Sequence, residues 1–213
     1  MFVGERMSHP VITVSPDTPV HDALAMFRKE NIRRAPVVKN GKMFGIVSES
    51  DLLNASPSPA TSLSVWEMNY LLSKVLVKHV MTKKVITVDV DTPIEEAARI
   101  MADKKIGGMP VMRSGKVAGM ITETDLFKIF FELMGARTKA LRVTALIEEK
   151  PGQLAKVTKA IAQAGGNFIA FGMFSGPDSG TRIITFKVEG MTKNSVTNAL
   201  SKVVKKFWDI RQS

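Results

Sequence analysis

The sequence contains no cysteine, which excludes a disulfide framework and any zinc site with cysteine ligands. Its three histidines, His9, His21 and His79, lie in unrelated contexts, so no metal-site spacing and no nucleophile paired with a base is present. No apolar run reaches transmembrane length, and the first ten residues lack the apolar core of a signal peptide. These absences argue against catalysis, a resident metal and a membrane partner, and they favour a cytoplasmic protein.

Acidic residues are scarce in the last third of the chain. Of the net charge of +10, residues 1–138 contribute +3 (18 Lys/Arg against 15 Asp/Glu) and residues 139–213 contribute +7 (12 against 5). A nucleic-acid-associated regulator that uses this basic face is therefore an alternative interpretation. The excess is spread over helix-like segments with no recognition helix and no aromatic RNA-binding pattern, so a solvated basic surface is favoured; it includes Lys156, Lys159, Lys202, Lys205 and Lys206.

An internal repeat organises the first two thirds of the chain. Residues 7–53 align without a gap on residues 81–127, with 18 identities in 47 pairs at an offset of 74. Both copies carry Val-Ile-Thr-Val, then Asp-Thr-Pro, then Pro-Val, and finally Gly-x-x-Ser/Thr-Glu-x-Asp-Leu. Duplication of one supersecondary unit explains this match.

Each copy predicts the order β-α-β-β-α. Segments 11–14 and 85–88 predict a first strand, and Asp-Thr-Pro predicts a helix that threonine caps and proline begins. Asn40-Gly41 and, more weakly, Ser114-Gly115 predict a two-residue turn between the next two strands, and a second helix starts at Ser48 or Thr122. Apolar residues at helical spacing predict the buried face of the first helix: Val20, Ala23, Leu24 and Phe27 in one copy and Ile94, Ala97, Ala98 and Met101 in the other.

The segment between the copies has its own pattern. Residues 54–60 are rich in turn formers, and residues 62–79 predict an amphipathic bridging helix that contains Trp66, Tyr70, Leu71 and Leu72.

The most informative motif closes each copy. Ser48 and Asp51 in the first copy match Thr122 and Asp125 in the second. Such a pair is typical of a helix capping box. It also suits a ligand, because the hydroxyl and the free helix N–H groups can face a phosphate while the carboxylate accepts hydrogen bonds from ribose hydroxyls. The two roles can coexist.

This order and ending resemble the cystathionine β-synthase (CBS) domain, and two copies resemble the pseudo-twofold pair that such domains form. The resemblance implies that each copy binds an adenosyl compound, such as AMP, ADP, ATP, S-adenosylmethionine or a dinucleotide, with the motif above on its ribose and phosphate. It implies an adenine slot in each copy, lined by Val11, Ile12, Thr13, Arg33, Arg34, Ala35 and Pro36 in the first and by Val85, Ile86, Thr87, Ile106, Gly107, Gly108, Met109 and Pro110 in the second.

The two implied slots differ. Arg33 and Arg34 can add charge-assisted contacts to phosphates, whereas Gly107 and Gly108 only open space. The first copy is therefore expected to bind phosphate-rich ligands better. Alternatively, the arginines are solvated surface at a helix end.

From about residue 139 the pattern changes to βαββαβ. Strands are expected at 141–147, 167–174, 182–188 and near 210, with helices at 151–164 and 193–205. This order is ferredoxin-like, and Pro-Gly-Gln-Leu with Gly-Gly-Asn-Phe-Ile resembles the ACT domain. The resemblance implies dimerisation and an amino-acid effector at Gly152, Gln153 and Asn167, although Gly152 and Asn167 could instead only shape turns. Glu149 and Lys150 stand where many members have Asp before Pro-Gly.

The predicted fold class is thus α/β (α+β) in four segments: CBS repeats at 1–60 and 80–136, a linker at 61–79, and an ACT domain at 139–213. The combination resembles accessory proteins of acetoin utilisation. We therefore expect a non-enzymatic, homodimeric sensor that binds an adenine nucleotide and regulates another protein.

Overall fold

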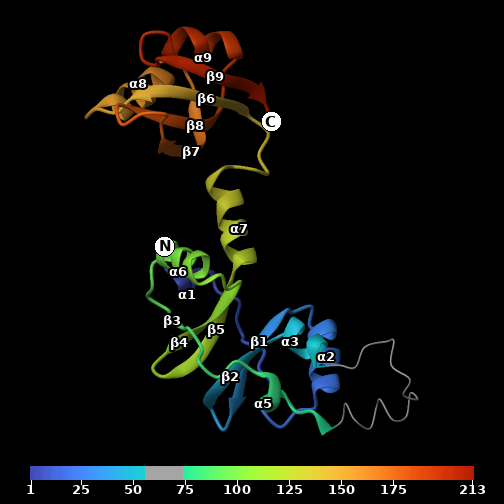
Figure 1. Cartoon of the computed structure of the whole chain (residues 1–213). Helices are drawn as coiled ribbons and strands as arrows, with labels where there is room; N and C mark the ends of the chain where they lie inside the picture. Colours follow the sequence, from blue (N-terminus) through green and yellow to red (C-terminus); the bar gives the residue numbers. More distant parts are fainter. Residues whose placement is uncertain (56–73) are drawn as a thin grey trace. The chain divides into compact units, whose positions relative to one another are not determined.

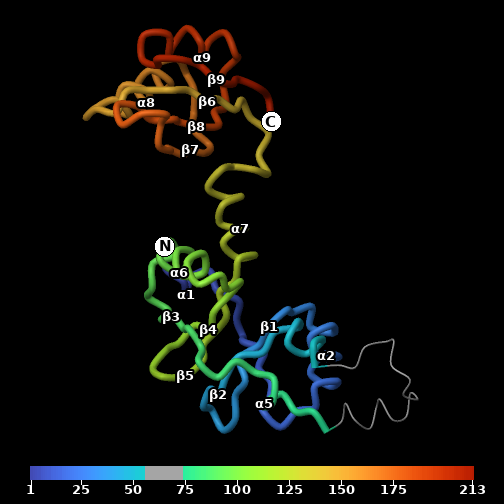
Figure 2. The backbone as a smooth tube through the Cα atoms, in the orientation of Figure 1, coloured from blue at the N-terminus to red at the C-terminus, as the bar shows by residue number. Residues whose placement is uncertain are grey.

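The computed structural model describes residues 1–55 and 74–213, and it contains two compact units, Met1–Leu126 and Phe127–Ser213. Figure 1 labels the elements of each unit, and Figure 2 follows the backbone through them. Most of the predicted bridging helix, with Trp66, Tyr70, Leu71 and Leu72, lies outside the described residues, as do residues 56–60 of the predicted break. Among the described residues, no helix is long and apolar enough to cross a membrane.

The first unit contains both repeats. Its elements are α1 (Val3–Arg6), α2 (Val20–Lys29), β1 (Arg34–Lys39), β2 (Lys42–Ser48), α3 (Glu49–Asn54), α5 (Val77–Val80), β3 (Val88–Asp89), α6 (Ile94–Lys104), β4 (Gly108–Arg113), β5 (Lys116–Thr122) and the start of α7 (Glu123–Leu133).

The two antiparallel hairpins, β1–β2 and β4–β5, form as predicted. Asn40 and Gly41 have φ of 51° and 74°, and Ser114 and Gly115 have φ of 49° and 77°. Two consecutive residues with positive φ match the twist of a tight hairpin, which explains why both copies carry this turn.

The start of each repeat differs from the prediction. The first strand is reduced to a parallel bridge between Val14 and Val37 in one copy and to the two-residue β3 in the other. Helices α2 and α6 begin one residue later than expected, because Pro19 and Pro93 themselves occupy the N-cap and no side chain caps either helix. Thr92 accepts a hydrogen bond from the Asp89 N–H (3.0 Å) instead of capping α6.

The short first strands follow from an exchange between the repeats. The Ser8 backbone pairs with Met120 of the second copy, and Thr82 pairs with Ile46 of the first. The segments after Ser8 and Thr82 therefore cross from one copy to the other and cannot form a continuous ladder with either.

The same exchange builds the two cores. Val3 of α1 is fully buried in the core of the second repeat, and Val77 of α5 is fully buried in the core of the first. Helix α2 buries its predicted face in full, whereas α6 buries Ala97 and Met101 but leaves Ile94 and Ala98 half-buried. Each repeat is therefore completed by the helix that precedes the other repeat.

The second unit has the predicted βαββαβ order after the end of α7. Its elements are β6 (Leu141–Glu148), α8 (Gln153–Gln163), β7 (Asn167–Ser175), β8 (Thr181–Glu189), α9 (Lys193–Leu200) and β9 (Lys206–Gln212). The antiparallel sheet has the order β7-β8-β6-β9. Helices α8 and α9 pack through Val157, Ile161, Val196 and Leu200 on one face of that sheet. Helix α9 ends five residues before the predicted Lys205, and the Val203 and Val204 N–H groups close this end on the Leu200 carbonyl.

Candidate functional site: a pocket between the two repeats

A cavity of about 250 Å³ lies inside the first unit, where residues of both repeats meet. The first repeat contributes Arg34, Ile46, Ser48 and Asp51, and the second half of the unit contributes Thr82, Lys84, Val85, Ile86, Ile106, Gly107 and Gly108. The cavity thus combines a carboxylate, two hydroxyl side chains, two cations and an apolar slot.

Ser48 and Asp51 form the capping box at the start of α3. Both the N–H and the hydroxyl of Ser48 donate to Asp51 Oδ2, at 2.8 and 2.6 Å, and the Asp51 N–H donates back to Ser48 Oγ at 3.2 Å. The other oxygen, Asp51 Oδ1, accepts no hydrogen bond from residues 1–55 or 74–213. One oxygen of Asp51 therefore caps the helix while the other is available at a half-buried position in the pocket.

The matching pair in the second repeat has the same local geometry but deeper burial. The N–H and the hydroxyl of Thr122 donate to Asp125 Oδ2, at 3.0 and 2.7 Å. The Asp125 residue is only 5% exposed, whereas Asp51 is half-buried. The two carboxylates thus differ in their access to a ligand.

Arg34 of the first repeat lies against Gly107 and Gly108 of the second. A Cβ atom on Gly107 would lie 2.6 Å from Arg34 Nη2 and 2.9 Å from Glu123 Oε2, and one on Gly108 would lie 2.9 Å from Arg34 Nη1. The space that the two glycines leave open is therefore occupied by the guanidinium, which would have to shift for any larger residue at these positions.

The pKa of Arg34 is affected by charged groups of both repeats. Burial lowers the pKa of its guanidinium, the Glu123 carboxylate raises that pKa, and the neighbouring Arg33 charge lowers it. An arginine keeps its charge in proteins even when partly desolvated. The pocket therefore contains a partly desolvated positive charge, with Lys84 as a second cation in its wall.

The predicted slots are assembled differently from the expectation. We expected each repeat to supply its own slot, but Ser48 and Asp51 share a cavity with Val85, Ile86 and Ile106 of the second copy. Arg34, Gly107 and Gly108 all line this one cavity, and the predicted contrast between an arginine slot and a glycine slot stays a prediction.

The remaining predicted residues lie elsewhere. Ala35, Pro36, Met109 and Pro110 are buried in β1 and β4, and Arg33 is exposed. Val11, Ile12, Thr13 and Thr87 do not line this cavity, and neither do Thr122 and Asp125. Ile46, Thr82 and Lys84 line it and were not predicted, because the Thr82–Ile46 bridge that brings them together depends on the exchange between repeats.

The predicted effector residues of the C-terminal unit do not meet within one chain. Gly152 has φ of 79° at the start of α8, and the Gln153 side chain donates to the Val203 carbonyl (2.6 Å). Asn167 donates to Glu189 (2.8 Å). The Glu148 end of β6, which leads to Gly152, pairs with the start of β8, whereas Asn167 pairs with its end. The two positions therefore lie at opposite ends of the sheet.

No metal centre is found among the residues that the structure describes: no group of three or more His, Cys, Asp or Glu side chains is close enough to hold an ion.

The family model described as "CBS domain" matches residues 3–58 and 77–132, which is more than half of the chain, and the protein belongs to this family. A CBS domain-containing protein of Dictyostelium discoideum is 30% identical over 136 residues, which cover 63% of this chain and 94% of that protein. The two repeats are therefore a tandem CBS pair, and the matched ranges end before the sheet of the C-terminal unit begins.

Several solved structures are similar to the CBS pair of this chain. The CBS domain pair of protein MJ0100, in complex with 5′-methylthioadenosine and S-adenosyl-L-methionine, is 27% identical with a TM-score of 0.52, over 65% of this chain and 98% of that one. CBSX2 in complex with AMP is 28% identical with a TM-score of 0.50, over 61% and 96%. A Vibrio cholerae protein assigned to acetoin utilization (AcuB) is 28% identical with a TM-score of 0.53, over 64% and 95%.

Proposed function

We propose that this protein is a non-catalytic sensor whose CBS pair binds an adenine nucleotide in the cavity between the repeats. The observation that carries this proposal is the composition of one cavity, in which Asp51, Arg34 and Lys84 surround the apolar slot of Val85 and Ile86. Relatives of known structure that are named for complexes with AMP and with S-adenosyl-L-methionine support it.

Each part of the ligand has a matching group. Asp51 Oδ1 accepts hydrogen bonds from the ribose hydroxyls, and the adenine ring lies against Val85, Ile86 and Ile106. Arg34 and Lys84 bind the phosphate, for which a planar guanidinium supplies paired donors. Two cations against one carboxylate favour AMP, ADP or ATP over an uncharged nucleoside. A cavity of about 250 Å³ is below the roughly 300–1,000 Å³ of drug-sized pockets, which favours a mononucleotide over a dinucleotide.

We propose that Thr122 and Asp125 form a second, weaker site. Shifting the lining residues by the repeat offset of 74 places Val11, Ile12, Ile32, Arg33 and Arg34 around it. The two arginines stand where the first pocket has Gly107 and Gly108, so the second slot has less room.

Calorimetric titration of the whole protein with AMP tests the first site. Asp51→Ala should weaken AMP binding by about 10- to 100-fold, because a hydrogen bond to a charged group is worth about 1.5–3 kcal/mol. Asp125→Ala should have a smaller effect. Asp103→Ala removes the same charge from the exposed face of α6 and should have none. Unchanged AMP binding in both Asp51→Ala and Asp125→Ala would rule out the ribose assignment.

A second titration separates the phosphate contact from the rest of the site. Arg34→Gln should weaken AMP binding by about tenfold or more and leave 5′-methylthioadenosine binding nearly unchanged, since that ligand carries no phosphate. Equal losses for both ligands would show that Arg34 holds the pocket in shape and does not select phosphate.

We further propose that the C-terminal unit is an ACT-type effector module that works as a homodimer. The ferredoxin-like sheet supports this, and the separation of Gly152 from Asn167 in one chain means that an amino-acid site would need both ends from two chains. The similarity to the AcuB structure favours a regulatory role in acetoin utilisation through a partner protein. Light scattering that gives a monomer for the whole protein would contradict the dimer.

A further inference from the structure

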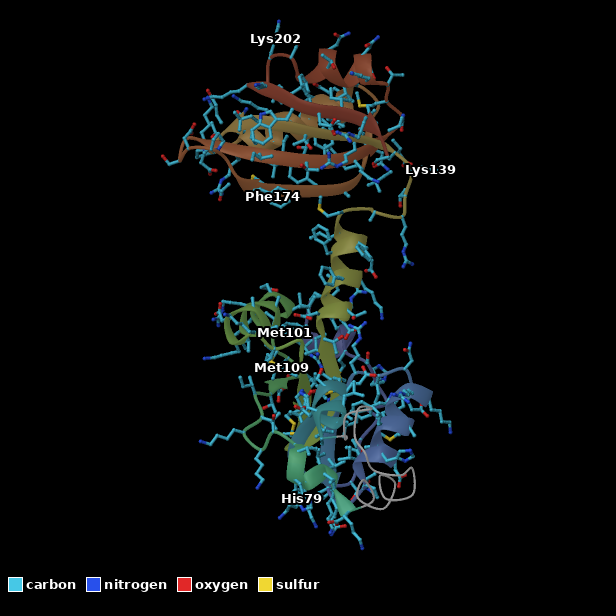
Figure 3. All side chains as sticks on the ribbon, turned by 45° about the vertical axis from the view of Figure 1, so that its right-hand side comes forward. His79, Met101, Met109, Lys139, Phe174 and Lys202 are labelled. Atoms are coloured by element: carbon cyan, nitrogen blue, oxygen red, sulfur yellow. The ribbon has the colours of Figure 1, made fainter. Side chains whose placement is uncertain are left out.

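A second cavity, of about 180 Å³, lies within the C-terminal unit and has a strongly basic wall. It opens where the end of β6, the start of α8 and the turn between α9 and β9 come together, and Figure 3 labels Lys202 on that turn. We call it the lysine pocket; its lining residues are Glu148, Lys150, Gln153, Lys156, Lys202, Val203, Val204 and Lys205.

The backbone around the lysine pocket is fixed by hydrogen bonds. The buried Gln153 side chain donates from Nε2 to the Val203 carbonyl (2.6 Å), which ties the α9–β9 turn to α8. The Lys205 N–H donates to the Leu146 carbonyl (2.8 Å), which ties the same turn to β6. The stems of the lysines therefore start from a rigid frame, and their ammonium groups can gather on a ligand without rearrangement of the chain.

The charge of the lysine pocket is not balanced. Its wall carries four lysines and one glutamate, a net charge of +3. Glu148 forms an ion pair with Lys150. Hydrogen bonding from Lys150 lowers the pKa of Glu148, and the charges of Lys205 and Lys156 lower it further. Within the continuously described range 74–213, Lys156, Lys202 and Lys205 form no ion pair with a carboxylate.

The start of α8 adds to the net positive charge of the lysine pocket. This 11-residue helix has no acidic residue in its first turn, and no side chain caps it at Gly152. No acidic side chain of the first turn therefore offsets the positive end of its dipole.

We propose that the lysine pocket binds a compact ligand with two or more negative charges, carried by phosphate or carboxylate groups. The lysine pocket shares no lining residue with the nucleotide site between the CBS repeats. It shares Gln153 with the predicted amino-acid site but contains neither Gly152 nor Asn167, and a zwitterion without net charge would not offset three unbalanced ammonium groups. A cavity volume of about 180 Å³ suits a small molecule better than an extended polymer.

Calorimetric titration of the whole protein with pyrophosphate and with citrate tests this proposal. The double variant Lys156→Gln/Lys205→Gln should weaken binding of at least one of these anions by about tenfold or more, since each lost contact is a charge-assisted hydrogen bond. The matched control Lys159→Gln/Lys193→Gln removes two exposed lysines from α8 and α9 and should change binding less than twofold. All four lysines are exposed, so both variants should fold.

The two titrations, with pyrophosphate and with citrate, identify which anionic group the pocket binds. Binding of pyrophosphate alone assigns phosphate, and binding of citrate alone assigns carboxylate. No binding of either anion would overturn the proposal, and so would equal losses in the two double variants, which would indicate a diffuse basic surface open to nucleic acid. Asp51→Ala should leave pyrophosphate binding intact, and the pocket variant should leave AMP binding intact. Loss of pyrophosphate binding in Asp51→Ala or Arg34→Gln would move the anion to the CBS pocket and contradict the inference.

Discussion

The two CBS repeats have the same fold but do not offer the same site. Strands β1–β2 and β4–β5 pair in equivalent register, with the irregularity at equivalent positions after Val37 and Val111. The residues that differ lie at the edge of the pocket, where Arg33-Arg34 stands opposite Gly107-Gly108 in the alignment. The shared residues hold the fold, whereas the differences lie among residues that line or flank the proposed ligand pocket.

The assembly of the pocket from both repeats changes what this difference means. Arg34 belongs to the first repeat and lines the pocket of Asp51, where its guanidinium lies against Gly107 and Gly108 of the second repeat. A substitution in one copy therefore changes the lining of a pocket to which the other copy also contributes.

The largest expected difference between the repeats is in their cores. Leu52 of α3 is fully buried, whereas its counterpart Leu126 of α7 is half-buried. Leu52→Ala should lower the free energy of unfolding of the first unit by about 2–5 kcal/mol. Leu126→Ala should lower it by less, because less apolar surface loses its contacts. Urea unfolding followed by circular dichroism measures both, and equal losses would contradict the difference in packing.

A smaller loss of stability is expected at two equivalent glycines, which contact the exchanged segment in each repeat. A Cβ on Gly45 would lie 2.7 Å from the Thr82 carbonyl oxygen, and one on Gly119 would lie 2.9 Å from that of Ser8. Gly45→Ala and Gly119→Ala should each destabilise the first unit by about 1–3 kcal/mol, because the exchanged segment must shift.

Gly180→Ala is the control for this pair, since its Cβ would meet only Asp178 Oδ1, at 3.4 Å. It should have little effect on the urea midpoint. A large difference between Gly45→Ala and Gly119→Ala would show that the exchange is not reciprocal.

The smallest effect concerns an ion pair of the first repeat that has no counterpart in the second repeat among the described residues. Asp17 accepts from Lys39 (2.6 Å) and Lys78 (3.0 Å), and these hydrogen bonds lower its pKa. A carboxylate with a lowered folded-state pKa stabilises the fold above its unfolded pKa, near 3.9, and this stabilisation is lost as pH falls through the folded pKa. All three side chains are about half exposed, so the effect is small.

Melting curves from pH 7 down to pH 2 measure this effect. Asp17→Asn should have a slightly lower Tm than the parent protein at pH 7, and the gap should close at the acid end. Asp91→Asn, the counterpart in the second repeat, should match the parent throughout. A gap for Asp17→Asn that persists at pH 2 would show that the charge is not its cause.

The sequence predicts the parts of each repeat better than their assembly. Local signals, such as Asn40-Gly41 and the apolar spacing of α2, depend only on residues that are close together in the sequence. They predict the hairpins and the helix correctly. The apolar residues that share a cavity with Ser48 and Asp51 were not predicted, because they belong to the other repeat and are brought there by the Ile46–Thr82 bridge. No local pattern shows that Thr82 pairs with Ile46 or that Val3 enters the second core.

The exchange of α1 and α5 has a consequence for how such a chain could arise. A single repeat lacks the helix that fills its own core, because that helix packs into the neighbouring copy. An ancestral chain of one repeat would therefore have had to form a reciprocal dimer before gene duplication joined the two halves. For the same reason, a protein cut between the repeats should recover its structure only when both pieces are present together.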